Sequence, residues 1–155
     1  MLNPMPDAYS RNPTTYRLSY SAFKYTELQV TSPTATNWSG HSTLIVEVTV
    51  TNIGSVISDE VLQIYTSWDP EQGWSQSTRV PVRQLVAFDR LEAVAPGASR
   101  KWKGGINADR YALVDNTGKS VIPPGKLTLS VGGHQPTKYS SAASGSECVS
   151  KVMTL

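Results

Sequence analysis

The sequence has only one cysteine, Cys148, among its 155 residues, so no disulfide bond within the chain is possible. A single cysteine does not indicate which redox compartment the protein occupies. No histidine or cationic residue stands beside Cys148 to favour a thiolate, so we expect it to be a small buried side chain. A chain of this length buries about 70% of its unfolded surface on folding. One domain without disulfide support is therefore expected.

Two targeting features are also missing. The sequence has no run of 18 apolar residues, so no transmembrane helix and no membrane insertion are predicted. Its first residues, Met1 to Asp7, lack the basic and then apolar order of a signal peptide. If the native protein is secreted, its signal must lie upstream, and the sequence leaves the localisation unassigned.

Charge is low and scattered. The 14 Lys and Arg residues nearly balance the 12 Asp and Glu residues, which leaves no basic surface for nucleic acid. Motifs of chemistry are absent as well: we find no His, Cys, Asp and Glu cluster at metal spacing, no glycine-rich phosphate loop and no nucleophile motif. His41 and His134 stand in loop contexts, and Asp59 and Glu60 are interpreted as solvated charges on opposite strand faces. No catalytic residue, metal or cofactor is predicted.

What the sequence does contain is a series of short alternating apolar runs between Gly, Pro, Asn and Asp. The clearest places Leu44, Val46, Val48 and Val50 on one face of a strand. Further strands are predicted at 18–30, 59–65, 84–91, 99–106 and 148–155, and residues 121–133 pair a turn with a strand whose Leu127, Leu129 and Val131 face inward. The count predicts an all-β fold, an antiparallel sandwich of seven or eight strands of the immunoglobulin or fibronectin type III-like kind.

The segments between these strands are assigned from their turn residues. Residues 1–17, rich in proline, are predicted to be an extended leader, which leaves 18–155 as the domain. Residues 67–78 are predicted to be a polar loop. Gly104 and Gly105 suggest a bulge or a close backbone approach. Asn107 is expected to cap a short helical turn.

Six segments resemble, in the same order, landmarks of one known family. They are Leu18-Ser-Tyr-Ser-Ala-Phe, Val48-Thr-Val-Thr-Asn-Ile-Gly, Glu60-Val-Leu-Gln-Ile-Tyr, Arg83-Gln-Leu-Val-Ala-Phe-Asp-Arg-Leu, Val94-Ala-Pro-Gly and Pro124-Gly-Lys-Leu-Thr-Leu-Ser-Val-Gly. Together they are similar to the C-terminal fibronectin type III-like domain of family 3 glycoside hydrolases, the β-glucosidases and β-xylosidases. The resemblance covers residues 18–133. The glycine-rich piece that precedes Leu-Ser-Tyr in the β-xylosidase pattern is missing here.

The resemblance implies a domain that works beside catalytic domains. The nucleophile and the acid/base of these retaining hydrolases belong to the earlier domains, which this chain lacks. We therefore expect a non-catalytic accessory domain that docks on other protein domains or subunits, including a second copy of itself. If the chain follows the family, it is secreted or enters the secretory or vacuolar pathway. A fragment of an active family 3 glycoside hydrolase is an alternative.

A second alternative is a carbohydrate-binding module. Trp68 and Trp74, with Tyr65 at the base of the same segment, offer flat rings to sugars, and Asp69 offers hydrogen bonds to hydroxyls. Equally, one or both tryptophans would fold back over the end of the core. Trp102 is expected in the core between two solvent-facing lysines. Asn37 begins an N-glycosylation sequon, which matters only in a secretory context.

Overall fold

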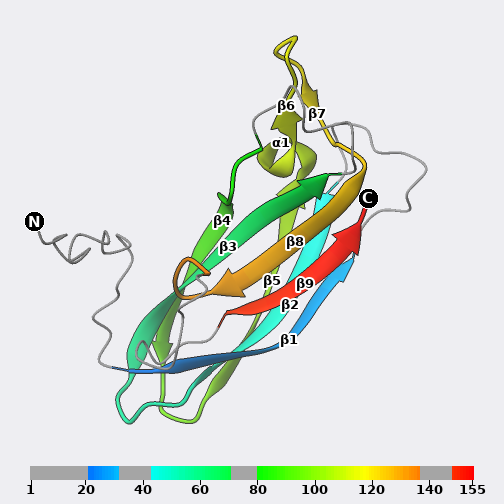
Figure 1. The fold of residues 1–155 in the computed structure, drawn as a ribbon. Coiled ribbons are helices and arrows are strands. Elements are labelled where there is room, and N and C mark those ends of the chain that lie inside the picture. The colour runs from blue at the N-terminus through cyan, green and yellow to red at the C-terminus, as the bar shows by residue number, and fades with distance from the viewer. Residues whose placement is uncertain (1–20, 32–42, 71–79, 137–147) are drawn as a thin grey trace, which may run out of the picture.

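The structure is a computed structural model that describes residues 21–31, 43–70, 80–136 and 148–155. These residues form two antiparallel sheets packed face to face, with a small hairpin at one end (Figure 1). The first sheet has the order β1-β2-β5 and the second β4-β3-β8-β9. Their bounds are β1 Phe23–Thr31, β2 Thr43–Asn52, β3 Ser58–Pro70, β4 Gln84–Val94, β5 Ser99–Asn107, β8 Gly125–Gly132 and β9 Val149–Thr154. The predicted sandwich is confirmed, with seven strands in its two main sheets over the residues described.

The first sheet follows the alternation of β2. Leu44, Val46, Val48 and Val50 all point into the core, as predicted, while the residues between them are partly exposed. Such a two-residue period buries one face of a strand and leaves the other to solvent. β2 is the middle strand, paired on one side with β1 and on the other with β5.

The second sheet corrects the predicted loop at 67–78 over its first residues. β3 continues to Pro70, because Ser67, Trp68 and Asp69 pair with Thr128, Leu127 and Lys126 of β8. The polar residues of this stretch predicted a loop, but an antiparallel ladder accepts polar residues on its solvent side. Residues 71–79, the rest of the predicted loop, lie outside the described residues.

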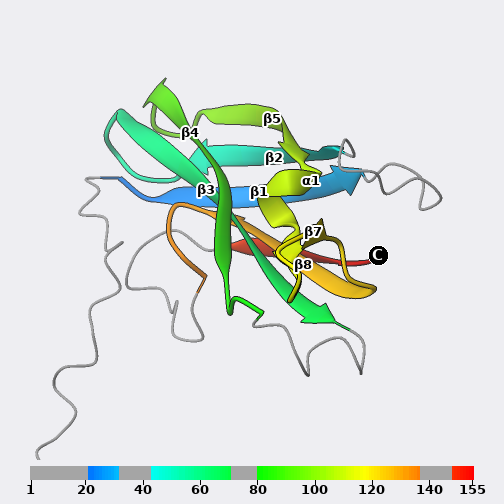
Figure 2. The ribbon, with the colours of Figure 1, turned by 90° about the horizontal axis from the view of Figure 1, so that it is seen from above.

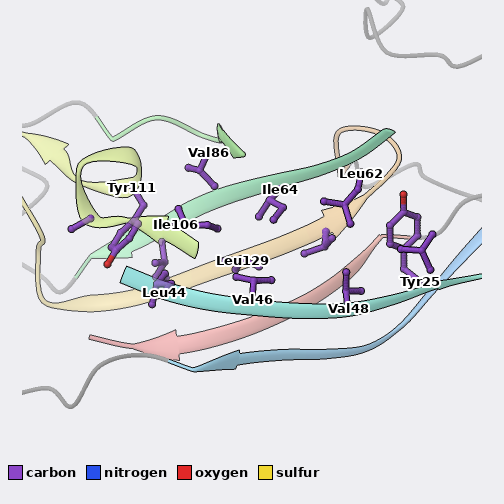
Figure 3. Packing of buried hydrophobic residues seen from close by; sticks show 14 of the residues in the cluster. Tyr25, Leu44, Val46, Val48, Leu62, Ile64, Val86, Ile106, Tyr111 and Leu129 are labelled. Carbon is purple, nitrogen blue, oxygen red and sulfur yellow. The ribbon is translucent and has the colours of Figure 1, made fainter. Parts of the chain in front are cut away.

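The core lies between the sheets and is closed at one end by the short helix α1 (Ala108–Tyr111). Figure 3 shows Ile64 and Leu129 of the second sheet facing Val46 of the first. Tyr111 is fully buried beside Leu44 and Ile106 at the α1 end. As predicted, Leu127, Leu129 and Val131 are fully buried. Beyond α1, β6 (Leu113–Val114) and β7 (Ser120–Val121) form the projecting hairpin of Figure 1.

One acidic residue differs from its predicted place. Glu60 is only 1% exposed, and the Tyr25 hydroxyl donates a hydrogen bond of 2.6 Å to its Oε1. The β3 alternation explains this, because Glu60 shares the inward face with Leu62 and Ile64. A buried carboxylate needs such partners to offset its lost hydration. The solvated interpretation was therefore wrong for Glu60.

The β5–α1 segment corrects two further expectations. The β2–β5 register runs unbroken through Gly104 and Gly105, so there is no bulge. The close approach does occur, because a Cβ atom at Gly104 would collide with the ring of Trp102. Asn107 precedes α1 but makes no side-chain cap; its Oδ1 instead accepts a hydrogen bond of 2.9 Å from the Thr43 hydroxyl. The neighbouring strand offered a donor that the sequence pattern did not reveal.

Trp102 is partly buried against the core, with Lys101 and Lys103 exposed on either side as predicted. Its indole Nε1 donates a hydrogen bond of 2.7 Å to Asp89 Oδ2 on β4. Because β4 and β5 are edge strands of different sheets, this bond ties the two sheets together along one side. No helix of the described residues is long and apolar enough to span a membrane. The predicted leader, residues 1–17, lies outside the described residues.

Candidate functional site

A groove opens between the edge strands β4 and β5 where they diverge toward α1. Figure 2 shows the two strands close together beside their connecting turn and apart near α1. The groove has a volume of about 370 Å³. Its lining residues are Leu85, Val86, Ala87, Phe88, Gly105, Ile106, Asn107 and Arg110. The Trp102–Asp89 hydrogen bond lies next to this lining, since Asp89 follows Phe88 on β4.

The β4 side of the groove carries two exposed apolar side chains. Phe88 is 72% exposed and Leu85 is 48% exposed, whereas Val86 between them is buried. The β3–β4 register shifts between the pairs Ile64–Ala87 and Tyr65–Leu85, so Val86 is an extra residue on β4. Such a bulge bends a strand and re-aims its side chains. Val82, just before β4, is also largely exposed.

The polar lining residues of the groove are Asn107, just before α1, and Arg110 within it. Gln84 Nε2 donates a hydrogen bond of 2.9 Å to the backbone oxygen of Arg110, which ties α1 to the start of β4. Arg110 Nε lies 3.9 Å from Asp109 Oδ2, and both side chains are largely exposed. An exposed pair at that distance stabilises little. The Arg110 guanidinium thus supplies a donor-rich polar end to a mostly apolar groove.

A second bulge in β4 is held by Asp59. Its Oδ1 accepts a hydrogen bond of 2.7 Å from the amide of Ala93, whose φ is 48°. Its Oδ2 pairs with the Arg90 guanidinium, and this bond raises the pKa of Arg90. The bulge and its carboxylate anchor fix the far end of β4. The exposed side chains of the groove therefore stand on a supported strand.

The residues predicted to bind carbohydrate do not gather into one exposed platform in the part of the chain that is described. Trp68 is 9% exposed and belongs to the core, and its Nε1 donates a hydrogen bond of 2.7 Å to the Tyr111 backbone oxygen. Tyr65 is also 9% exposed; its hydroxyl bonds to Gln63 Oε1, and burial raises its pKa. Asp69 is exposed. Trp74 lies outside the described residues, as does Asn37.

Trp68 therefore follows the second of the two expectations, that of a tryptophan folded over the end of the core. An indole this deeply buried and bonded through its N–H has no open ring face for a sugar. Tyr65 is similarly covered. Of the three residues that the structure describes, Asp69 is the one at the surface.

Cys148 is half-buried, and its thiol donates to the backbone oxygen of His134 at 3.3 Å. Burial raises the pKa of the Cys148 thiol to about 11. The sulfur lies 3.8 Å from His134 Nδ1, yet a thiol with so high a pKa stays protonated at neutral pH and is a poor nucleophile. Across the described residues, no group of three or more His, Cys, Asp and Glu side chains could hold a metal ion.

Comparison with known proteins supports this fold. Residues 60–135, just under half of the chain, match the model of the fibronectin type III-like domain. This segment carries a fibronectin type III-like domain. The predicted resemblance to family 3 glycoside hydrolases is supported by its relatives. A β-xylosidase of Formosa agariphila is 31% identical over 117 residues, which are 76% of this chain and 15% of that protein. A probable exo-1,4-β-xylosidase of Aspergillus flavus is 32% identical over 95 residues, which are 58% of this chain and 11% of that protein.

Solved structures agree. The β-D-glucoside glucohydrolase of Trichoderma reesei is 26% identical to this chain, with a TM-score of 0.65 over 90% of this chain and 19% of that protein. The GH3 β-glucosidase of Bifidobacterium adolescentis has a TM-score of 0.66 at 21% identity, over 89% of this chain and 18% of that protein, and shares the fold. The fibronectin type III-like chain thus spans less than a fifth of the length of these relatives.

The groove was not predicted from the sequence, although a signal for it exists. Between Val80 and Phe88, apolar residues occur at both odd and even positions: Val80, Val82, Leu85, Val86, Ala87 and Phe88. A strand with one buried face needs only every second residue to be apolar. The excess on β4 indicates an apolar outer side, which is where the structure places Phe88 and Leu85.

Proposed function

We propose that this fibronectin type III-like chain is a non-catalytic accessory domain that docks, through the β4–β5 groove, on the catalytic part of a β-xylosidase-type glycoside hydrolase. The observation that carries the proposal is the pair of exposed apolar side chains on β4, Phe88 and Leu85, at the rim of that groove. Burying a large apolar side chain contributes about 1.5–3 kcal/mol. Two such side chains on a supported strand favour contact with another protein surface.

The relatives support the choice of partner. Two relatives that are similar in sequence over more than half of this chain are named β-xylosidases and are much longer than it. The chain's own described surface offers no pair of carboxylates in a shaped cleft, which glycoside hydrolysis requires. Asp59 holds a bulge and Glu60 is buried, so both have structural tasks. The domain would then stabilise an enzyme rather than act on its substrate.

The test is a fusion. The full chain replaces the segment of the Formosa agariphila β-xylosidase that matches it, and the temperature of half-inactivation is measured against the truncated enzyme that lacks this segment. Docking predicts that the fusion is inactivated several degrees higher. Phe88→Asp should remove at least half of that gain, because it places a charge in the apolar contact. Val152→Asp, at another exposed apolar position, on β9, should not.

The proposal fails if the fusion and the truncated enzyme lose activity at the same temperature. If the truncated enzyme has no activity and the fusion has, the domain is required and the proposal stands. If Phe88→Asp and Val152→Asp behave alike, docking occurs through another surface. These three results distinguish a failure of the proposed accessory function from a wrong assignment of its docking surface to the groove.

Carbohydrate binding is a second candidate, favoured by the exposure of Asp69 at the end of β3, immediately before the segment that holds Trp74. Xylan oligosaccharides should then change the tryptophan fluorescence of the full chain, and Trp74→Ala should abolish the change. Trp68 is buried, so its emission serves as an internal reference. An unchanged spectrum at millimolar sugar would reject this candidate.

A further inference from the structure

The end of the sandwich opposite α1 carries an apolar surface without charge. It is formed by the β2–β3 loop and the β4–β5 turn, which Figure 1 shows side by side at the lower end of the molecule. Residues 52–58 and 93–99 contain no Lys, Arg, Asp, Glu or His. Ile53, Val56 and Ile57 are 57%, 45% and 61% exposed. We call residues 53–57 and 95–98 the uncharged end.

The uncharged end is rigid because Asn52 holds it together. The side chain of Asn52 is fully buried, and its Nδ2 donates to the backbone oxygens of Val56 and Val94, each at 2.8 Å. Its Oδ1 accepts from the amide of Gly54 at 2.9 Å. Its backbone bonds to Gly97 and Ala98 across the turn. The backbone that carries the three exposed side chains is therefore held in place before any partner arrives, which lowers the entropy cost of binding.

The chain also enters the domain at this end. The backbone oxygen of Ala22 accepts a hydrogen bond of 2.8 Å from the Ile53 amide. The hydroxyl of Ser21 donates to Asn52 Oδ1 at 2.5 Å. In Figure 1 the start of β1 lies beside the β2–β3 loop. Any domain that precedes residue 21 is thus connected to the molecule next to the uncharged end.

We infer that the uncharged end is a second docking surface, and that its occupant is an apolar, uncharged surface of the enzyme domain that precedes this domain in the chain. The inference rests on the proposed function, because it takes the glycoside hydrolase as the partner. The chain enters the domain beside the uncharged end, so an enzyme domain joined ahead of Ser21 lies next to that end. The charges at its border, Asp59 and Arg90, are paired with each other. The three branched apolar side chains therefore match a surface of the same kind, since a charged partner would lose its hydration there.

Hydrogen exchange tests this assignment. Deuterium uptake is compared between the full chain alone and the full chain fused to the catalytic part of the Formosa agariphila β-xylosidase. The inference predicts that residues 53–57 and 95–98 exchange at least tenfold more slowly in the fusion. The β6–β7 hairpin, at the opposite end, should be unchanged. Ile57→Lys should restore fast exchange at the uncharged end, while the control Val152→Lys should not.

Each other outcome is decisive. Slower exchange along β4 and β5 alone, with residues 53–57 unchanged, overturns the inference and leaves docking through the groove intact. Unchanged exchange over the whole domain overturns both. Protection that is lost equally in Ile57→Lys and Val152→Lys also contradicts the inference. High salt should not reverse the protection, because no ion pair is involved.

Discussion

At the scale of single residues, the side chain of Asn52 holds one end of the sandwich together. One buried amide serves two backbone carbonyls, one backbone amide and one hydroxyl. Each buried polar group left without a partner costs about 1–3 kcal/mol. The β2–β3 loop, the β4–β5 turn and the start of β1 all depend on this side chain.

Asn52→Ala should therefore lower the free energy of unfolding by about 2–4 kcal/mol, measured by urea denaturation. Asn107→Ala is the matched control. Asn107 is exposed and its side chain makes one hydrogen bond, with Thr43, so its loss should cost about 0.5 kcal/mol or less. Equal effects of the two substitutions would show that Asn52 does not organise the end of the sandwich.

Cys148 gives a prediction for alkaline pH. In the unfolded chain a thiol ionises near pH 8.5, whereas burial raises the pKa of Cys148 to about 11 in the fold. Between these values the unfolded state binds fewer protons than the folded state, so stability falls as pH rises. Burial raises the pKa of Tyr111 to about 12 with the same sign, but its effect begins only above pH 10.

The midpoint of urea unfolding should thus begin to fall at about pH 9. Cys148→Ala should flatten the fall between pH 9 and 10 and reduce it between pH 10 and 11, while the fall that Tyr111 causes above pH 10 remains. An unchanged profile in Cys148→Ala would mean that the thiol ionises normally in the folded protein.

Residues also show where prediction from sequence stops. Alternation identified the buried positions of β2 and β8, because the two-residue period of a strand is local. The Tyr25–Glu60, Trp68–Tyr111 and Thr43–Asn107 hydrogen bonds instead join residues far apart along the chain. The sequence pattern around each residue contains no information about those partners.

At the scale of elements, β4 combines two bulges with an apolar outer side. The second bulge contains Ala93 in the left-handed region of φ, which costs a residue with a Cβ atom about 1–2 kcal/mol. Ala93 is exposed, so a substitution there changes little packing. The sequence could suggest β4 as a strand, but not its bulges, because they follow from its pairing with β3.

Ala93→Gly should raise the stability by about 0.5–1 kcal/mol, and Ala93→Val should lower it by at least about 1 kcal/mol. Ala95→Gly, at an exposed neighbour that is not among the positive-φ residues, should instead lower it slightly. Chemical denaturation checks all three. A loss of stability in Ala93→Gly would contradict the assignment of a left-handed residue at this bulge.

At the scale of the whole molecule, two apolar surfaces stand at different places on one sandwich. The groove lies between β4 and β5 near α1, and the uncharged end lies at the opposite end. The fold class followed from periodicity and resemblance, whereas these surfaces appear only when the strands are placed in space. A domain with two such surfaces is suited to pack against a larger protein rather than to be joined to it by a flexible linker alone.

Small-angle X-ray scattering of the fusion with the Formosa agariphila catalytic part tests the central claim of docking most directly. Docking predicts a single compact particle, whose distance distribution has one maximum and does not change with salt. A distribution with a second maximum, as given by two bodies joined by a linker, would contradict the account.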